Sequence, residues 1–298
     1  MNALGAIEAG GTKFVCGIGT EDGTVLDKIS FPTTTPEETI GRVEDYFRGK
    51  KIAALGIGAF GPIDPRKDSP TYGYVTSTPK PYWGGFNLLG ALNRNINVPT
   101  GFDTDVNGAA LGEALFGAAK GLDNCMYITV GTGIGAGALI NGKRVHGLSH
   151  PEMGHIIVRR HPQDEYEGRC PYHRDCLEGL AAGPAIEERW GVKGSELGAD
   201  HAAWEMEADY LAQALMNYIL ILSPEKIVMG GGVMKQQQLF PLIRQKLIRL
   251  LNGYVQQEAI LDAAENYIVP PALGDNAGLC GALALAAEAY SEERKDSV

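Results

Sequence analysis

Four side chains of the kind that bind soft metals gather in one short stretch: His155, Cys170, His173 and Cys176. The last three follow a C-x2-H-x2-C spacing, which lets one compact loop surround an ion. Two thiolates and two imidazoles form a closed tetrahedral zinc site of the structural kind, whereas a catalytic zinc keeps one position open. The stretch therefore predicts a structural Zn2+. It disfavours metal-assisted hydrolysis, and it disfavours a zinc finger because the finger spacing and a following basic helix are missing.

Two carboxylates, Glu152 and Glu178, bracket these ligands. Carboxylates accept strong charge-assisted hydrogen bonds from hydroxyl groups. A loop held by zinc and edged by carboxylates therefore predicts a site for a small, hydroxyl-rich ligand. The plainer alternative is that these histidines and cysteines are packed or reactive side chains.

The first glycine turn follows an apolar strand expected over residues 4–7, and it consists of Gly10, Gly11, Thr12 and Lys13. Glycines let backbone N–H groups approach phosphate oxygens, and the threonine hydroxyl and the lysine ammonium add further donors. A Walker P-loop is excluded, because its spacing is absent and a strand follows where a helix is required. The alternative is a plain β-turn.

A second glycine turn, which contains Thr132 and Gly133, superficially matches the dinucleotide-binding fingerprint. A strand and an Asn-Gly turn follow where that fingerprint needs a helix, so a Rossmann site is rejected. Two such turns facing each other across a domain cleft would clamp a polyphosphate.

A third glycine run follows the strand expected over residues 226–229 and includes Gly231 and Gly232. It would let a base or a ribose approach the backbone, and its alternative role is a simple helix-entry turn. Gly183 and Pro184 complete the set of candidate nucleotide-binding residues.

A polar cluster stands at the end of the strand expected over residues 99–102, and it contains Asp103, Asp105 and Asn107. The plainer alternative is that one of the two aspartates only caps the helix that follows. A carboxylate directed out of a strand end is also a natural general base, and phosphoryl transfer needs little more than positioning, charge neutralisation and such a base. Asp105, together with Asn107, is the candidate for orienting an attacking hydroxyl.

The composition is that of an ordinary globular protein of about two domains, with 298 residues and 44% hydrophobic content. A formal net charge of −10 disfavours nucleic acid as a partner. Cys16, Cys125 and Cys280 lie in apolar runs and are expected to be buried thiols, which suits a reducing compartment. Neither a secretory signal nor a membrane-spanning run is found, so a cytoplasmic protein without a membrane partner is expected.

One pattern of strand, glycine turn, strand, hairpin turn and strand occurs twice, over residues 4–29 and 125–146. We therefore predict two α/β domains of one architecture, each an antiparallel meander joined to parallel strands and helices. The expected domains are 1–117, joined by the helix 276–298, and 118–275. The expected helices cover 36–48, 108–116, 199–222, the segment from 233 to about 251, and a last one from about 274.

Residues 61–86 show no period and are rich in proline, glycine, tyrosine and threonine. A loop of this length inside a compact domain is usually functional. We therefore include this loop among the candidate ligand-binding segments.

Taken together and in order, several motifs resemble the ROK family of sugar kinases over essentially the whole chain. They are Glu-Ala-Gly-Gly-Thr-Lys (8–13), Asp-Val-Asn-Gly-Ala-Ala-Leu-Gly-Glu (105–113), Gly-Thr-Gly-Ile-Gly-Ala-Gly (131–137), Pro-Glu-Met-Gly-His (151–155) and Cys-Leu-Glu-Gly (176–179). Residues 8–14 and 79–88 resemble the bacterial fructokinase branch of that family.

The resemblance implies an actin-like, hexokinase-like fold of two duplicated α/β domains, with ATP, Mg2+ and a sugar in the cleft, and a homodimer. It implies Asp105 as the catalytic base. The sugar contacts that it implies are Gly61, Pro62, Asn87, Asp105, Glu152, His155 and Glu178. His155 would then serve twice, with one ring nitrogen on zinc and the other near a sugar hydroxyl.

Two positions depart from the family pattern. Many members have aspartate where this chain has Glu8, so a role for Glu8 in reaching Mg2+ through water does not carry over directly. His173 stands where an all-cysteine version of the motif is common, so its role as a ligand rests on spacing and chemistry.

These observations favour an ATP:hexose 6-phosphotransferase, and specifically a fructokinase. A glucokinase, a mannokinase and an N-acetylhexosamine kinase of the same family remain open. A sugar-sensing regulator without catalysis is the alternative from another class. It is disfavoured because the first strand begins at about Leu4, which leaves no room for a DNA-binding extension, and because the charge is unfavourable.

Overall fold

A computed structural model describes residues 3–296, and the chain forms two compact units. The first unit contains Met1–Gly121, Arg144–Pro151 and Ala272–Val298, and the second contains Leu122–Lys143 and Glu152–Pro271. The domain limits expected from the sequence stay a prediction. Within the described range, no helix combines the length and apolarity that a membrane span requires.

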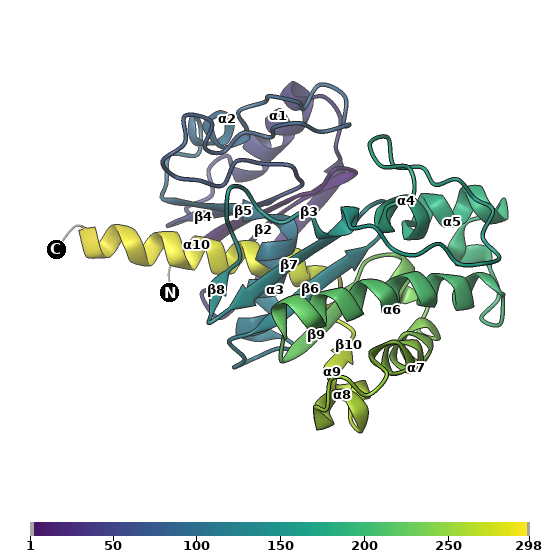
Figure 1. Cartoon of the computed structure of the whole chain (residues 1–298). Coiled ribbons are helices and arrows are strands. Elements are labelled where there is room, and N and C mark those ends of the chain that lie inside the picture. Colours follow the sequence, from purple (N-terminus) through teal and green to yellow (C-terminus); the bar gives the residue numbers. More distant parts are fainter. Residues whose placement is uncertain (1–2, 297–298) are drawn as a thin grey trace. The chain divides into compact units, whose positions relative to one another are not determined.

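The first unit is built on a five-stranded sheet in the order β3-β2-β1-β4-β5 (Figure 1). Its strands are β1 (Leu4–Ala9), β2 (Lys13–Gly19), β3 (Val25–Pro32), β4 (Leu55–Ala59) and β5 (Thr100–Thr104). The first three strands pair antiparallel, and β4 and β5 continue the sheet in parallel. The carboxyl ends of β1, β4 and β5 therefore meet at one edge of the sheet.

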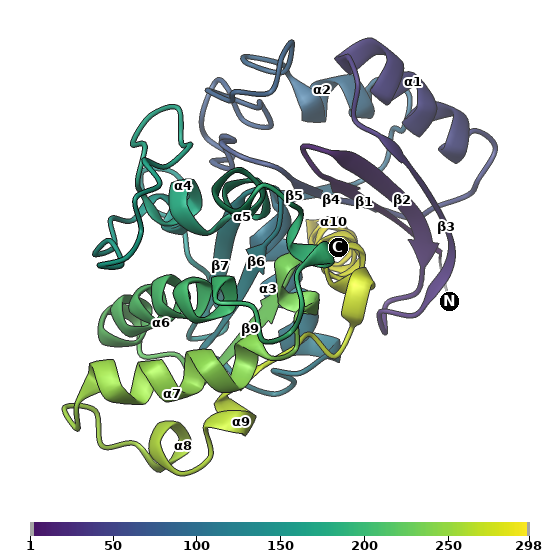
Figure 2. The ribbon, with the colours of Figure 1, turned by 90° about the vertical axis from the view of Figure 1, so that its right-hand side faces the viewer.

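Helices cover both faces of this sheet. In Figure 2, α1 (Pro36–Phe47) and α2 (Leu88–Asn93) lie on one side, and α3 (Asp105–Phe116) and α10 (Ala277–Asp296) lie on the other. The last two helices pack closely because both have a glycine at their contact: a Cβ atom at Gly281 would lie 1.9 Å from the carbonyl oxygen of Gly108.

The second unit repeats the strand order, as β8-β7-β6-β9-β10. Its strands are β6 (Cys125–Val130), β7 (Ile134–Ile140), β8 (Lys143–Arg144), β9 (Lys226–Gly230) and β10 (Ile268–Val269). The pair β6 and β7 is antiparallel, and β9 joins β6 in parallel, as β4 joins β1 in the first unit. The duplicated meander predicted from the sequence is thus present.

The helices of the second unit include a packed pair, α6 (Ala203–Leu222) and α7 (Leu239–Leu251). The shorter ones are α4 (Leu177–Ala181), α5 (Gly183–Trp190), α8 (Glu258–Leu261) and α9 (Ala264–Tyr267). Single 3-10 turns complete the chain: η1 (Met153–His155), η2 (Gly194–Glu196), η3 (Val233–Lys235) and η4 (Gly274–Asn276).

The structure differs from the sequence expectations at several element ends. The helix expected over 108–116 begins earlier, at Asp105, because the Thr104 hydroxyl accepts a hydrogen bond from the Asn107 N–H (3.1 Å) and caps the helix. The strand expected from residue 144 onward stops at Arg144, whose side chain turns to Asp103. The short helices α2, α4, α5, α8 and α9 were not predicted, since they are shorter than the window in which helical periodicity is visible.

Glu113 is a fully buried acceptor on α3. Its carboxylate accepts from the backbone N–H groups of Ala118 (2.6 Å), Ala272 (3.2 Å) and Leu273 (3.0 Å). Those donors lie beside the two points where the first unit's chain is interrupted, after Gly121 and before Ala272. The side chain therefore ties both chain ends of the first unit to one helix.

We expect Glu113→Ala to lower the free energy of unfolding by about 2–4 kcal/mol, because buried N–H groups lose a charged acceptor. Urea unfolding followed by circular dichroism measures this change. Glu21→Ala, at an exposed position, is the matched control and should change stability by less than about 0.5 kcal/mol. A similar small loss for both variants would contradict the role of Glu113.

Candidate functional site

Asp103 lies at the end of β5 and is 1% exposed, so its charge must be balanced inside the first unit. Its oxygens lie 2.8 Å from Nε of Arg144 and 3.0 Å from Nε2 of His146. Asn107 donates through Nδ2 at 2.9 Å, and the Thr104 N–H donates at 2.7 Å. Asp103 is therefore a structural acceptor rather than a group directed at a ligand.

The neighbours of Asp103 also decide its ionisation. Burial alone would raise the pKa of this carboxyl, but the hydrogen bond from His146 and the nearby charges outweigh burial and hold its pKa below the ordinary value. Asp103 therefore stays a carboxylate across the physiological range.

Asp105 is the first residue of α3 and is half-buried. Its Oδ1 accepts a hydrogen bond from the Val106 N–H at 2.9 Å. Gly58 on the neighbouring strand β4 allows the helix to begin there, since a Cβ at that position would lie 3.2 Å from the Asp105 Cα. Asn107, expected to assist Asp105, is buried and donates to Asp103 instead.

The loop over residues 61–86 and Asn87, which follows it directly, carry the other sugar contacts expected from the first unit. The Gly61–Pro62 peptide bond is cis, and the next N–H, of Ile63, donates to Nε2 of His150 at 3.0 Å. Asn87 caps α2 by accepting from the Gly90 N–H at 2.7 Å, which leaves its amide hydrogens as donors for a ligand.

Asp64 organises this loop from within. Its carboxylate accepts from Nε of Arg66 (3.0 Å) and from the hydroxyls of Ser69 (2.5 Å) and Thr71 (2.7 Å). The hydrogen bonds from Arg66 are the main reason that the pKa of Asp64 lies well below its ordinary value.

In the second unit, the four predicted metal ligands come together. One ligand atom from each of His155, Cys170, His173 and Cys176 lies within 4.8 Å of the others. Nδ1 of His155 is 3.4 Å from Sγ of Cys176 and 3.6 Å from Sγ of Cys170, and Nδ1 of His173 is 3.7 Å from the latter. The cluster is a compact four-donor set.

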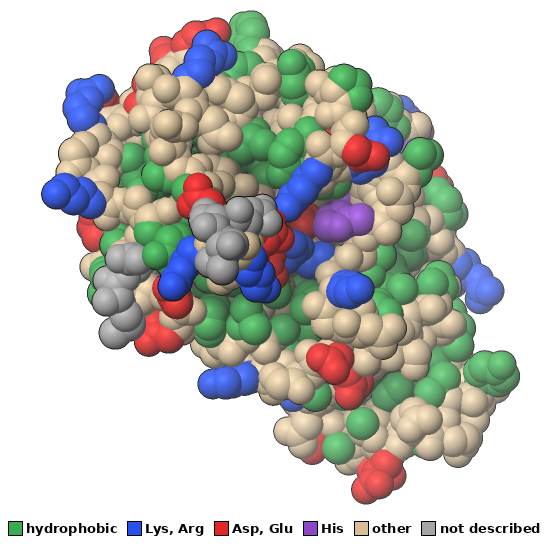
Figure 3. All heavy atoms as spheres, turned by 90° about the vertical axis from the view of Figure 1, so that its left-hand side faces the viewer, with side chains coloured by type: hydrophobic (Ala, Val, Ile, Leu, Met, Phe, Trp, Pro, Cys, Tyr) green, Lys and Arg blue, Asp and Glu red, His purple; other side chains and the backbone are tan. Residues whose placement is uncertain are grey.

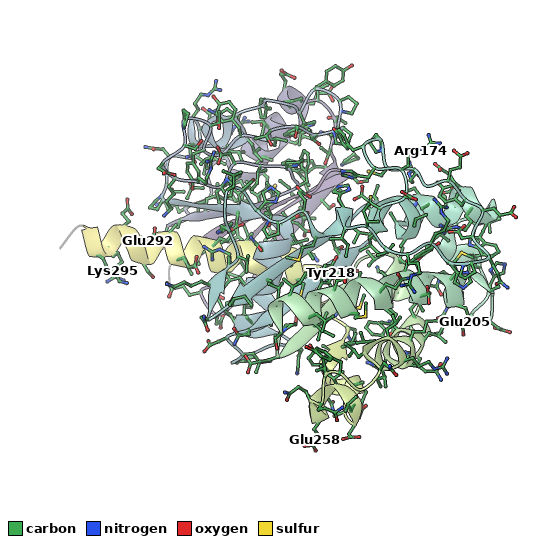
Figure 4. All side chains as sticks on the ribbon, in the orientation of Figure 1. Arg174, Glu205, Tyr218, Glu258, Glu292 and Lys295 are labelled. Carbon is green, nitrogen blue, oxygen red and sulfur yellow. The ribbon has the colours of Figure 1, made fainter. Side chains whose placement is uncertain are left out.

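The surroundings of the cluster fix it in place. Tyr218, on α6, donates its hydroxyl to the carbonyl of Met153 at 2.6 Å and so holds the turn that carries His155 (Figure 4). Arg174 lies on the outer side of the loop, with φ of 58° and an exposed side chain. The loop thus turns between two of its ligands while its charged side chain stays in solvent.

Glu178 joins the cluster to the second glycine turn. Its Oε2 accepts from the Ile134 N–H at 2.9 Å, and its Oε1 lies 3.9 Å from Nε2 of His155. A Cβ at Gly133 would lie 2.6 Å from Oε2, so glycine is required there for this approach. The two ring nitrogens of His155 therefore face different partners.

A cavity of about 410 Å³ lies in the second unit. The predicted nucleotide-binding residues among its walls are Thr132, Gly183, Pro184 and Gly232. The Gly183 N–H donates to the Gly131 carbonyl at 2.8 Å, which brings the start of α5 against the glycine turn. Gly133 and Gly231 belong to the same turns but do not line the cavity.

Sequence reasoning missed several further residues of this cavity, among them Lys193, Trp204 and Gln236. Trp204 is almost completely buried, and the Gln236 side chain donates to the Gly194 carbonyl at 3.1 Å. No spacing pattern marked them, because they are brought together by the packing of α6, η2 and η3.

The first glycine turn lies in the first unit. It is closed by a hydrogen bond from the Gly10 N–H to the Lys13 carbonyl (3.0 Å), with Gly11 half-buried and Thr12 and Lys13 exposed. Thr33 supports it by donating its hydroxyl to the Gly10 carbonyl at 2.7 Å. The turn is thus held from one side and presents its exposed residues on the other.

The chain belongs to the ROK family, whose sequence profile matches residues 4–289. The resemblance is therefore confirmed, and with it the hexokinase-like α/β fold. A Bacillus subtilis protein is 56% identical over 290 residues, covering 97% of both chains. The fructokinase of Pediococcus pentosaceus is 50% identical over 283 residues, covering 95% of this chain and 97% of that one.

Among solved structures, the ROK glucokinase of Streptomyces griseus in complex with glucose and AMPPNP is similar, with a TM-score of 0.79 and 25% identity. The match covers 96% of this chain and 99% of that one.

We expect Asp64→Asn to lower the melting temperature by about 3–6 °C at pH 7, because charge-assisted hydrogen bonds are lost. The folded-state pKa of Asp64 lies below that of the unfolded chain, about 3.9. Its stabilisation is therefore present above that pH and is lost as the pH falls through the folded-state pKa.

Calorimetry of the wild type and of Asp64→Asn from pH 7 to pH 3 tests this. The difference between the two should shrink as the pH falls below about 4. Asp68→Asn, in the same loop at an exposed position, is the control and should show no such pH-dependent difference. A difference for Asp64→Asn that does not change with pH would contradict the assignment.

Proposed function

We propose that this protein transfers the γ-phosphoryl group of ATP to the 6-hydroxyl of fructose. The observation that carries the proposal is its 43–56% identity to a set of relatives that includes fructokinases, over nearly the whole chain. The half-buried carboxylate of Asp105 at the end of β5, beside a structural Asp103, supports it from the site. We also expect a homodimer, which sedimentation analysis would test.

Asp105 is the proposed general base. It accepts the proton of the sugar hydroxyl as the oxygen attacks the γ-phosphorus, and ADP leaves with the bridging oxygen. Asp103 is unsuited to this role, because it is buried and its oxygens are already occupied by Arg144, His146 and Asn107.

The proposed sugar contacts come from both units. The first supplies the Gly61–Pro62 turn and the amide of Asn87, and the second supplies Glu152, His155 and Glu178. Fructose offers several hydroxyl groups, and the carboxylates of the second unit are suitable acceptors for them.

The proposed nucleotide contacts of the second unit are the walls of the 410 Å³ cavity, together with Gly133 and Gly231. Trp204 forms a buried apolar part of the wall, and Lys193 suits a phosphate. In the first unit, Gly11, Thr12 and Lys13 are the proposed phosphate donors, and Gly10 shapes their turn, since its N–H donates to the Lys13 carbonyl.

Mg2+ supplies neutralisation of the β- and γ-phosphate charge when it is bound. In kinases this ion is held by the phosphates, by waters and by only one or two carboxylates, so no closed cage is needed. Glu8 fits as a water-mediated partner: it is a mostly buried carboxylate, and burial raises its pKa, which a nearby cation would offset.

The Cys/His cluster fits a structural zinc. Bonds of about 2.3 Å to sulfur and about 2.0 Å to nitrogen, at tetrahedral angles, place sulfur and nitrogen about 3.5 Å apart. The sulfur–nitrogen separations of 3.4, 3.6 and 3.7 Å match this value. Zinc would fix the ring of His155 through Nδ1 and leave Nε2 directed toward Glu178 and the sugar.

A coupled ADP-release assay with Mg-ATP and four sugars tests the function. We expect kcat/KM for fructose to exceed that for glucose, mannose and N-acetylglucosamine by at least about tenfold, a difference of about 1.4 kcal/mol. Similar values for several hexoses would contradict the preference for fructose. The absence of turnover with all four would contradict the proposed phosphotransfer.

We expect Asp105→Asn to lower kcat by about 100- to 10,000-fold, because the attacking hydroxyl loses its base. Calorimetric titration should show fructose affinity within a few-fold of the wild type, since an amide keeps the shape of the carboxylate. Near-normal turnover would overturn the assignment of Asp105 as the base.

We expect about one zinc ion per chain by elemental analysis. Cys170→Ser should lose zinc and lower both the melting temperature and the fructose affinity, since the loop that holds His155 would loosen. Cys280→Ser changes a buried thiol outside the cluster and should keep its zinc. Unchanged folding and sugar affinity after treatment with EDTA, with zinc removed, would contradict the structural role.

A further inference from the structure

We propose that His146 is a positioning residue that acts through Asp103 to hold Asp105 in place. The inference rests on the proposed role of Asp105 as the base. It concerns the segment Arg144–Pro151 of the first unit, here called the strap. Neither the family resemblance nor the sequence analysis assigned a role to His146.

The first link is the contact between the strap and Asp103. Nε2 of His146 lies 3.0 Å from both carboxylate oxygens of Asp103 and 3.3 Å from Nδ2 of Asn107. The Asp103 side chain is 1% exposed, whereas that of His146 is 33% exposed. The histidine thus covers a buried carboxylate from the solvent side and satisfies it with a donor.

The second link runs from Asp103 to one residue on each side of Asp105. Oδ1 of Asp103 accepts from the Thr104 N–H, immediately before Asp105, at 2.7 Å. The same oxygen accepts from the side chain of Asn107, two residues after Asp105, at 2.9 Å. A shift of the Asp103 carboxylate therefore displaces residues on both sides of the proposed base, Thr104 and Asn107.

The strap has a second anchor in the substrate loop. Nε2 of His150, which is 9% exposed, accepts the N–H of Ile63 at 3.0 Å, directly after the cis Gly61–Pro62 bond. Two histidines of one short segment thus hold the strand end that carries the base and the loop that carries proposed sugar contacts. Because the segment is short, its two anchors fix one another's position.

A purely structural role of His146 would give a different result in kinetic and stability measurements. Arg144 also binds Asp103, and it is tied to α10 through Nη1 and Glu288 at 2.7 Å. Figure 3 shows a face of the molecule on which Lys or Arg and Asp or Glu side chains gather near a histidine. If the network only stabilised the fold, loss of either His146 or Glu288 would lower stability and leave kcat of the folded protein unchanged.

The test compares three substitutions of His146. His146→Ala removes the donor and should lower kcat about 10- to 100-fold with KM for fructose within about twofold, since small misplacements of a catalytic group are costly. In His146→Gln, the amide nitrogen can reach the place of Nε2, and kcat should return to within about threefold of the wild type. In His146→Asn, the amide is too short to reach that place, and the variant should behave like His146→Ala.

Glu288→Gln is the matched control, because it weakens the same network on α10 without removing a partner of Asp103. Its kcat should stay within about twofold of the wild type, as expected for a partly exposed ion pair. Melting temperatures of all variants identify any that fail to fold.

Amide hydrogen exchange supplies a readout independent of turnover. We expect faster exchange at Thr104 and Asn107 in His146→Ala than in Glu288→Gln or the wild type. If the wild type phosphorylates no hexose but this difference is present, the reaction assignment fails while the positioning of Asp105 stands. Unchanged exchange at these amides, or a kcat for His146→Ala equal to that of Glu288→Gln, would overturn the proposal.

Discussion

The burial of one carboxylate, Asp103, imposes the constraint around which the first unit's site is built. A charge that is removed from water must be paired and hydrogen-bonded, and Arg144, His146 and Asn107 do this together. Because the partners of the Asp103 charge come from the strap and from the first turn of α3, this carboxylate holds both segments in place. As a consequence, Asp105, two residues away, stands between two residues that Asp103 holds, and its own side chain is half-buried.

In the second unit, the Cys/His cluster and Glu178 hold the candidate site in place. The Cys/His cluster orders a long irregular loop that has little regular structure of its own, and Glu178 connects that loop to the second glycine turn. Glycine at position 133 makes the connection possible, because any side chain there would collide with the carboxylate. The proposed sugar-binding loop and the proposed nucleotide turn are thereby held by the same residue.

The sequence predicted the duplicated meander and the grouping of the four candidate metal ligands, because both rest on local spacing. It also placed Asp105 at a strand end, and it left open which aspartate served the helix. Only the structure separates the roles of these residues. Thr104 caps the helix, and Asp103 pairs with the strap about 40 residues later in the chain. Trp204, Gln236 and His146 were missed for the same reason, since tertiary packing places them and no motif marks them.

A crystal structure of the protein with fructose and a non-hydrolysable ATP analogue tests the central claim most directly. The account predicts that the 6-hydroxyl of fructose lies within hydrogen-bonding distance, about 2.6–3.2 Å, of an Asp105 oxygen. It also predicts that Asp103 keeps its contacts with His146 and Arg144 and remains away from the sugar. A sugar whose 6-hydroxyl is bound by another group, or a direct contact between Asp103 and the sugar, would contradict it.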